Sequence, residues 1–181
     1  MITIAGHTFD EGLLPKNATI LDLGCRGFEF TDYFSPNHFV IPIDADLLDE
    51  PDRYFRCAID GYNGRAGVKR ADDKQATKIV IGDEIECYTI QEFSRINDIG
   101  WFDLIKLDIE GSEYGAIMAL DKPIATQLSI EFHLHTGAYG QYEMTLMEDK
   151  LKALGYVAVQ HELTEEHCAG FNYWNSLFIL K

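Results

Sequence analysis

The sequence predicts an α/β fold in which helices cover both faces of a doubly wound, mostly parallel β-sheet. Short runs rich in β-branched and aromatic residues alternate along the chain with polar or amphipathic stretches. Most of these runs are continuously apolar, which is typical of strands buried on both faces. The chain has 181 residues, of which 46% are hydrophobic. Because a chain of this length can bury one full core, we expect residues 1–181 to form a single domain.

The predicted strands are apolar runs of four to seven residues. They are Thr19–Leu23, Phe39–Asp44, Tyr54–Ile59, Phe102–Asp108, Gln127–Phe132, Tyr156–His161 and Leu177–Leu180. The predicted helices are Ser112–Leu120 and Tyr142–Leu154. In the second helix apolar residues recur at spacings of three and four, and Gly155 supplies a C-terminal stop.

Two segments do not follow this alternation. Asp60–Lys78 is polar and contains three glycines, so it is predicted to be a surface loop. Glu162–Asn175 is rich in acids and aromatics and is also predicted to be irregular. The last two strands flank this second segment with no helix between them, so we expect them to be antiparallel neighbours.

The charge of the chain excludes several classes of partner. The sequence has 15 Lys and Arg residues against 30 Asp and Glu residues, which gives a net charge of −15. Such a surface repels nucleic acid and anionic membranes, so neither is expected as a partner. No signal peptide or bilayer-spanning run is expected. None of the four cysteines forms a C-x-x-C pair. We therefore expect a cytoplasmic protein with reduced thiols.

A glycine-containing turn, in the sequence LDLGCRGFEF, follows the first predicted strand. Gly24 and Gly27 permit a tight turn and a close approach of the backbone to a ligand. Asp44 lies 22 residues after Asp22, at the end of the next strand. An acid at this place can accept hydrogen bonds from a ribose diol. These features predict a nucleoside-binding site.

The expected nucleoside lacks a pyrophosphate, because the turn reads G-x-x-G rather than G-x-G-x-x-G. The sequence also contains no P-loop and no Tyr-x-x-x-Lys pair. A nicotinamide oxidoreductase is therefore a minor alternative. S-adenosylmethionine is a nucleoside ligand without a pyrophosphate, and it is the expected cofactor.

Ionisable residues that alternate along the chain gather at the ends of two later strands. In WFDLIKLDIEGSE and LSIEFHLHTG these residues are Lys106, Asp108, Glu110, Glu131, His133 and His135. Alternating residues share one side of a strand, and open α/β sheets bind ligands outside the carboxyl ends of their strands. Because burying unpaired charges costs several kcal/mol, this group predicts a functional site. Lys106 is expected to pair with one of the acids.

The sequence IKLDIEGSE, followed by IEFH at Ile130–His133, is similar to the signature of the FkbM-type methyltransferases. This family is a branch of the class I S-adenosylmethionine-dependent enzymes, and the resemblance covers roughly Thr19 to Leu180. It implies a Rossmann-like, seven-stranded sheet whose last strand is antiparallel. It also implies O-methyl transfer from S-adenosylmethionine to a hydroxyl of a small molecule or carbohydrate.

The resemblance also implies positions for the cofactor. Asp22, Gly24 and the following turn would hold the methionine part, and Asp44 would hold the ribose. Asp60 would approach the adenine, and Asp108 would lie beside the cofactor's amino group or the acceptor. The residues expected to bind the cofactor are Asp22, Gly24, Cys25, Arg26, Gly27, Asp44, Ala45, Asp60 and Asp108.

The sequence departs from the family's pattern at two of these places. The family usually shows D-x-G-A-N-x-G, whereas here Cys25 and Arg26 replace the Ala-Asn pair and Phe28 replaces the last glycine. The acid of the second strand is usually a Glu followed by Pro, whereas here Asp44 is followed by Ala45.

His133 is the expected general base, because its ordinary pKa suits neutral pH and Glu131 and His135 lie nearby to orient it. Asp108 and Glu110 are alternative bases. No metal is expected, although a divalent ion could be held by Asp108, Glu131, His133 and His135. An inactive, methyltransferase-like module that binds a ligand is the alternative to an enzyme. Aromatic residues that could line an acceptor pocket are Tyr139, Tyr142, Phe171, Tyr173 and Trp174.

Overall fold

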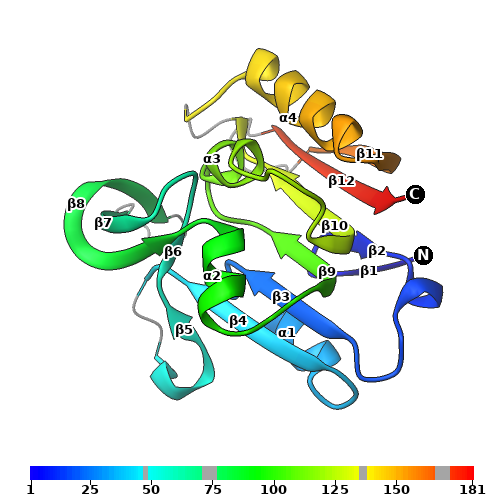
Figure 1. The fold of residues 1–181 in the computed structure, drawn as a ribbon, viewed down its shortest axis with the longest axis horizontal. Coiled ribbons are helices and arrows are strands. Elements are labelled where there is room, and N and C mark those ends of the chain that lie inside the picture. The colour runs from blue at the N-terminus through cyan, green and yellow to red at the C-terminus, as the bar shows by residue number, and fades with distance from the viewer. Residues whose placement is uncertain (47–48, 71–76, 135–137, 166–171) are drawn as a thin grey trace.

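The computed structural model describes residues 1–46, 49–70, 77–134, 138–165 and 172–181. Within these ranges the main sheet has seven strands in the order β5-β4-β3-β9-β10-β12-β11 (Figure 1). They are β3 (Thr19–Leu23), β4 (Phe39–Asp44), β5 (Phe55–Arg56), β9 (Phe102–Leu107), β10 (Ala125–Phe132), β11 (Tyr156–Glu165) and β12 (Asn172–Leu180). Neighbouring strands are parallel, except that β12 runs antiparallel to β10 and β11. The doubly wound sheet with an antiparallel last strand is therefore confirmed.

Helices cover both faces of the main sheet. They are α1 (Glu29–Phe34), α2 (Ile90–Ile96), α3 (Glu113–Met118) and α4 (Gln141–Ala153). Successive side chains of a strand point to opposite faces. Leu21 and Ile105 accordingly pack in the core beneath α2, α3 and α4, whereas Ile20 and Leu104 pack against α1. This two-sided burial explains why the predicted strands are apolar throughout.

Helices α3 and α4 confirm the predicted helices to within two residues at each end. Helix α2 is not among the predicted elements, although its N-terminus carries a sequence signal. The side chain of Thr89 accepts a hydrogen bond from the amide of Glu92 at 3.1 Å. Thr89-Ile90-Gln91-Glu92 has the S/T-x-x-E pattern of a helix start, so the helix could have been found from this signal.

The prediction of a surface loop over Asp60–Lys78 is wrong. Strands β7 (Gly64–Arg70) and β8 (Thr77–Tyr88) form an antiparallel hairpin. Together with β6 (Ala58–Ile59) they make a second sheet, of three strands among the described residues (Figure 1). The predicted strand Tyr54–Ile59 is correspondingly divided between β5 and β6, which lie in different sheets. A small core around Ala66 and Ile85 holds the hairpin. Its few apolar residues, separated by glycines and charges, give a weak strand signal.

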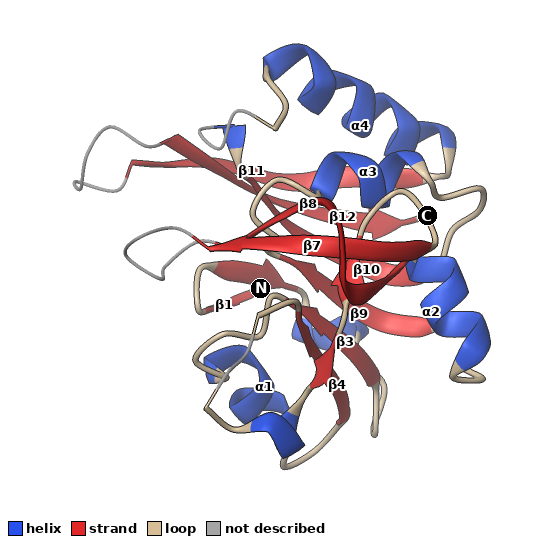
Figure 2. Cartoon of the chain, turned by 90° about the vertical axis from the view of Figure 1, so that its left-hand side faces the viewer, coloured by secondary structure: helices blue, strands red, loops and turns tan. Residues whose placement is uncertain are grey.

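The prediction of an irregular segment over Glu162–Asn175 is also wrong at both of its ends. Strand β11 continues to Glu165 and pairs there with Asn172 of β12. Residues 166–171 lie outside the described residues. The antiparallel pairing of the last two strands is confirmed. Backbone hydrogen bonds hold the hairpin together and do not require an apolar sequence. The search for apolar runs therefore did not predict strands in this segment. The β7–β8 and β11–β12 hairpins project toward the same side of the molecule (Figure 2).

A further hairpin near the N-terminus is not among the predicted elements. Strands β1 (Ile2–Ile4) and β2 (His7–Phe9) pair antiparallel across Ala5 and Gly6, both of which have positive φ. Two central residues with positive φ are the requirement of a type I′ hairpin turn. Phe9 packs against α1, beside the face of the main sheet that this helix covers. The hairpin carries His7 to the sheet.

No helix in the described part of the chain has the length and apolar character needed to cross a bilayer. Cys25, Cys57 and Cys87 are buried and form no disulfide among the described residues. Burial raises the pKa of each of these thiols. Cys168 lies outside the described residues, and the reduced state of the thiols stays a prediction.

Candidate active site

Gly24 brings the ends of β3, β4 and β9 together. Its φ is +81°, and a Cβ atom at this position would lie 1.8 Å from the carbonyl oxygen of Asp108. The amides of Gly24 and Cys25 donate to the carbonyl oxygen of Ile43, at 2.9 and 3.2 Å. Only glycine fits this close approach at positive φ. The turn therefore fixes Asp108 and Asp44 at the same edge of the sheet.

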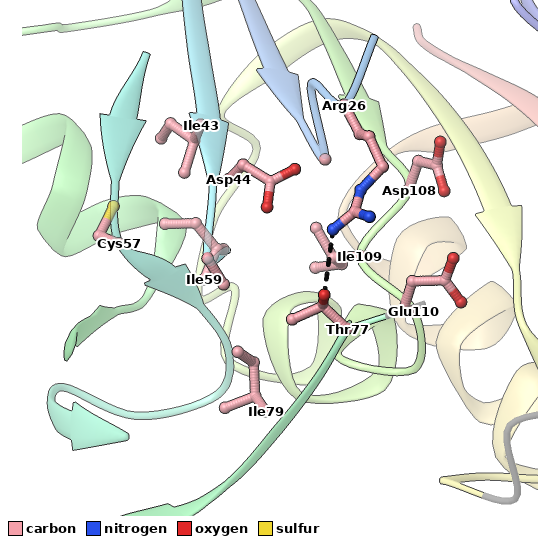
Figure 3. Close-up of a pocket in the computed structure, with 12 residues that line it drawn as sticks. Arg26, Ile43, Asp44, Cys57, Ile59, Thr77, Ile79, Asp108, Ile109 and Glu110 are labelled. Carbon is pink, nitrogen blue, oxygen red and sulfur yellow. Dashed lines mark hydrogen bonds between the residues drawn. The ribbon is translucent and has the colours of Figure 1, made fainter. Parts of the chain in front are cut away.

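A cavity of about 260 Å³ lies beside this turn (Figure 3). Among the residues predicted to bind the cofactor, those lining the cavity are Gly24, Arg26, Asp44, Ala45 and Asp108. The apolar part of the wall is formed by Ile43, Ile59, Ile79 and Ile109. Burial raises the pKa of Asp44, although the amide of Asp46 donates to its carboxyl at 2.8 Å. A carboxyl beside apolar walls fits a ribose with an attached aromatic base.

A further cavity, of about 240 Å³, shares Arg26 and Asp108 with the first. Its lining includes the predicted residues Asp22 and Cys25. Asp22 is fully buried, and its Oδ2 accepts a hydrogen bond from Thr31 Oγ1 of α1 at 2.6 Å. The shared lining places a polar extension beside the nucleoside-sized cavity, which fits an amino acid attached to the ribose.

Gly27 and Asp60 are predicted to bind the cofactor, but the structure places neither in the lining of these cavities. Gly27 lies in the turn before α1 with a φ of +78°. Asp60 Oδ1 accepts from the amide of Gly61 at 2.6 Å, and its Oδ2 accepts from Ser112 Oγ at 3.1 Å. Asp60 thus connects β6 to the start of α3 in this state.

Arg26 connects the glycine turn to the β7–β8 hairpin across the mouth of the cavity (Figure 3). Its Nη2 donates to Thr77 Oγ1 at 3.2 Å and to Asp46 Oδ2 at 2.9 Å. Asp46 also pairs with Arg70, which lies opposite Thr77 in the register of the hairpin. Through these contacts the buried side chain of Asp46 joins the hairpin to the glycine turn beside the cavity.

Phe28 replaces a glycine of the family's pattern and adopts the backbone conformation that favours glycine. Its φ is +56° and its ψ is +11°, just before α1 begins. The guanidinium of Arg53 lies 4.1 Å from the centre of the Phe28 ring, which also packs near Tyr54. These contacts stabilise a conformation that costs a non-glycine residue about 1–2 kcal/mol.

Lys106 pairs with acids, as predicted. Its Nζ lies 3.1 Å from Asp22 Oδ1 and 3.3 Å from Asp108 Oδ2, and it donates to the carbonyl oxygen of Gly24 at 2.7 Å. Burial by itself lowers the pKa of Lys106, but Asp108 and Asp22 outweigh this effect and raise it. Lys106 is therefore a permanent cation beneath the site.

His133 lies within reach of three carboxylates. Its Nδ1 is 2.8 Å from Glu113 Oε1, and its Nε2 is 3.5 Å from Asp108 Oδ1 and 3.7 Å from Glu110 Oε2. Burial lowers the pKa of His133, but the carboxylates, led by Glu113, outweigh this and raise it to about 10. In this state the imidazole is already protonated at neutral pH and has no free site for a substrate proton.

Glu113 organises this region, although it is not among the site residues predicted from the sequence. Its fully buried carboxylate accepts hydrogen bonds from the amides of Ile109 and Gly111, both at 3.0 Å. The hydroxyl of Tyr139 also donates to it at 3.0 Å. Tyr139 is therefore part of the support of His133 rather than an exposed acceptor surface. The sequence signal for this role of Glu113 was its position in the first turn of a predicted helix, just after Gly111.

Glu131 lies at the carboxyl end of β10 with its side chain 19% exposed. Burial and the neighbouring Asp108 raise the pKa of Glu131 to about 7. His7 reaches the same place from the N-terminal hairpin, 3.8 Å from Glu131 Oε2. His7 is not among the residues predicted from the sequence, and the local signal for it was the Ala-Gly turn that precedes it. His135 and Phe171 lie outside the described residues.

Comparison with known proteins identifies a family. The family model described as "Methyltransferase FkbM domain" matches residues 37–158. A solved structure of the Methanococcus jannaschii fibrillarin pre-rRNA processing protein is 12% identical, with a TM-score of 0.55 over 97% of this chain and 70% of that one. The 1,6-didemethyltoxoflavin-N1-methyltransferase of Burkholderia thailandensis is 14% identical, with a TM-score of 0.49 over 92% of this chain and 72% of that one. No curated protein matches the chain. The fibrillarin likeness shows a shared fold.

Proposed function

The chain belongs to the FkbM family of S-adenosylmethionine-dependent methyltransferases, and we propose that it methylates a hydroxyl group of a small molecule or carbohydrate. The observation that carries this proposal is the position of Asp108. It lines the nucleoside-sized cavity and also lies in the carboxylate and histidine cluster. Cofactor and acceptor sites would therefore meet at this residue.

The chain's own residues fit S-adenosylmethionine. Asp44 offers a carboxylate to the ribose hydroxyls, and the isoleucine walls accommodate the adenine. The adjoining cavity, with Arg26 and Asp22, suits the charged methionine part. When bound, the cofactor supplies an electrophilic methyl group on a positively charged sulfur. The nearby carboxylates favour that charge electrostatically.

Glu131 is the residue that we assign to accept the acceptor's proton. Asp108 is held by Lys106, and Glu110 lines the cofactor cavity. Glu131 is partly exposed, so an acceptor arriving from solvent can reach it. Positioning of the hydroxyl beside the methyl group supplies the main rate enhancement. A correctly placed base adds about 10²–10⁴-fold.

The test measures the formation of S-adenosylhomocysteine from S-adenosylmethionine in the presence of different acceptors. The acceptors are alkyl glycosides, polyols, and amino sugars that have the same ring as the glycosides. We expect turnover with hydroxyl acceptors, and we expect Glu131→Gln to lower kcat by about 10²–10⁴-fold. Glu86→Gln, an exposed carboxylate on β8, is the matched control. Turnover confined to the amino group would contradict the hydroxyl assignment. An unchanged kcat in Glu131→Gln would show that Glu131 is not the proton acceptor.

A further inference from the structure

Asp108 lies between the imidazoles of His7 and His133. Its Oδ2 is 3.6 Å from His7 Nε2, and its Oδ1 is 3.5 Å from His133 Nε2. The other ring nitrogen of each histidine is held in place. His7 Nδ1 is hydrogen-bonded to Ser129 Oγ at 3.2 Å, and His133 Nδ1 to Glu113 at 2.8 Å. A metal-binding histidine is commonly oriented by a hydrogen bond to its other ring nitrogen, as His7 is by Ser129.

His7 supplies an independent observation. Its side chain is fully buried, yet its Nε2 has no hydrogen-bond partner among the residues that the structure describes. The nearest acidic oxygens belong to Asp108 at 3.6 Å and Glu131 at 3.8 Å. A buried polar atom without a partner costs about 1–3 kcal/mol. An imidazole binds a metal through a ring nitrogen that is free of other partners.

The spacing of these atoms suits a shared cation better than direct hydrogen bonds. The ligand atoms of His7, Asp108 and Glu131 all lie within 4.8 Å of one another. Hydrogen bonds between nitrogen and oxygen are about 2.7–3.2 Å long. An ion about 2.1 Å from each ligand separates neighbouring ligand atoms by about 3–3.5 Å. The two distances from His7 Nε2, 3.6 Å to Asp108 and 3.8 Å to Glu131, exceed that range by only a few tenths of an ångström.

The charge of the cluster also favours a cation. The buried or partly buried carboxylates are those of Asp22, Asp108, Glu110, Glu113 and Glu131. Lys106 and the protonated His133 offset only part of this charge. Lys106 lies beside Asp22 and Asp108 and is not paired with Glu131. The cluster as a whole therefore carries excess negative charge, although Lys106 lies 3.3 Å from Asp108 Oδ2.

We propose that His7, Asp108 and Glu131 bind one divalent transition-metal cation of the Mn²⁺ or Zn²⁺ class. An imidazole ligand disfavours Mg²⁺ and Ca²⁺, which prefer oxygen ligands. The ion would lie where the acceptor hydroxyl is proposed to bind, and Glu131 would then be a metal ligand. The role of proton acceptor proposed for Glu131 applies to the metal-free protein. Binding itself requires neither cofactor nor acceptor, so the site stands independently of the proposed methyl transfer.

The test is a titration of the full chain with Mn²⁺ alone. The electron paramagnetic resonance signal of the free ion measures how much Mn²⁺ remains unbound. We expect one Mn²⁺ per chain and a rise in Tm when the ion is present. His7→Gln and Glu131→Gln should each weaken binding at least about tenfold, because each removes a ligand. The same additions should not raise Tm in these variants.

His38→Gln and Asp149→Asn are the matched controls, since they remove a histidine and a carboxylate elsewhere. Both should bind Mn²⁺ like the wild type. No bound Mn²⁺ at millimolar concentration would overturn the proposal, as would binding that both ligand variants retain. If His7→Gln does not fold, Mn²⁺ binding by Glu131→Gln alone tests the proposal. Binding of S-adenosylmethionine in metal-free buffer reports separately on the proposed function.

Discussion

Gly24 and Gly27 have nearly the same backbone conformation, with φ of +81° and +78°, but different surroundings. A Cβ at Gly24 would meet the Asp108 carbonyl, whereas one at Gly27 would have no atom within 4 Å. We expect Gly27→Ala to cost about 1 kcal/mol through its positive φ alone. Gly24→Ala should cost at least about 2 kcal/mol more and should weaken cofactor binding, because the strand ends must separate.

Urea unfolding and cofactor titration of the paired variants check this expectation. Gly27→Ala isolates the cost of the backbone conformation, so the difference between the variants reports on the contact with Asp108. Equal losses of stability in both variants would show that β3 and β9 do not meet as closely as described.

Asp60 allows a prediction about pH. Burial raises the pKa of Asp60 in the folded protein. The folded state therefore holds this proton more tightly than the unfolded state, whose pKa is about 4. The contribution of Asp60 to stability is present below that pH and is lost as the pH rises through the folded pKa. Asparagine does not titrate and can keep the contacts to Gly61 and Ser112.

We therefore expect Asp60→Asn to be more stable than the wild type at pH 7, with the gain shrinking toward pH 4. Unfolding midpoints at both pH values measure this. A gain that grows at pH 4 would contradict the sign. If the cofactor affinity also falls in this variant, Asp60 contacts the adenine as the family resemblance implies.

Some site residues were predictable because local spacing identifies them. Gly24, Asp44 and Asp108 each stand at the end of an apolar run, where an open α/β sheet binds ligands. His7 and Glu113 could not be found in this way. Their importance comes from packing between segments distant in sequence, such as the pairing of Glu113 with His133. The proton on His133 likewise depends on this packing.

At the level of elements, the β7–β8 hairpin forms part of the wall of the cavity that we propose for the cofactor. Thr77 and Ile79 of β8 line it, and Asp46 holds the hairpin through Arg26, Arg70 and Thr77. In β7 the apolar residues Ala66 and Val68 stand among glycines and charged residues, which concealed this hairpin in the sequence. By contrast, the continuously apolar runs of β3, β4 and β9 were predictable, because burial on both faces dictates their composition.

We expect Asp46→Asn to lower the free energy of unfolding by about 1–2 kcal/mol, since hydrogen bonds to a charged group are lost. Amide exchange at Thr77–Ile79 should accelerate, whereas β3 should be unaffected. Asp83→Asn is the control, because Asp83 is 84% exposed and pairs with the exposed Arg65. Its effect should stay within about 0.5 kcal/mol. Equal effects of the two substitutions on exchange would contradict the proposed attachment.

At the scale of the whole molecule, the order of strands places the site. The carboxyl ends of β3, β4, β9 and β10 meet at one edge, where the glycine turn, Asp44, Asp108 and Glu131 all lie. The alternation of runs predicted this topology. The N-terminal hairpin and the β7–β8 hairpin, which complete the site, were not predictable because neither resembles a buried strand of a parallel sheet.

The most direct measurement is calorimetric titration of the protein with S-adenosylmethionine, comparing the wild type with Asp44→Ala. We expect one cofactor per chain and at least about tenfold weaker binding in Asp44→Ala, because hydrogen bonds to a buried charged acceptor are lost. Asp103→Ala, at the amino end of β9, should bind like the wild type. Absence of binding by the wild type at millimolar cofactor, or equal affinity of the wild type and Asp44→Ala, would contradict the assignment of this cavity to the cofactor.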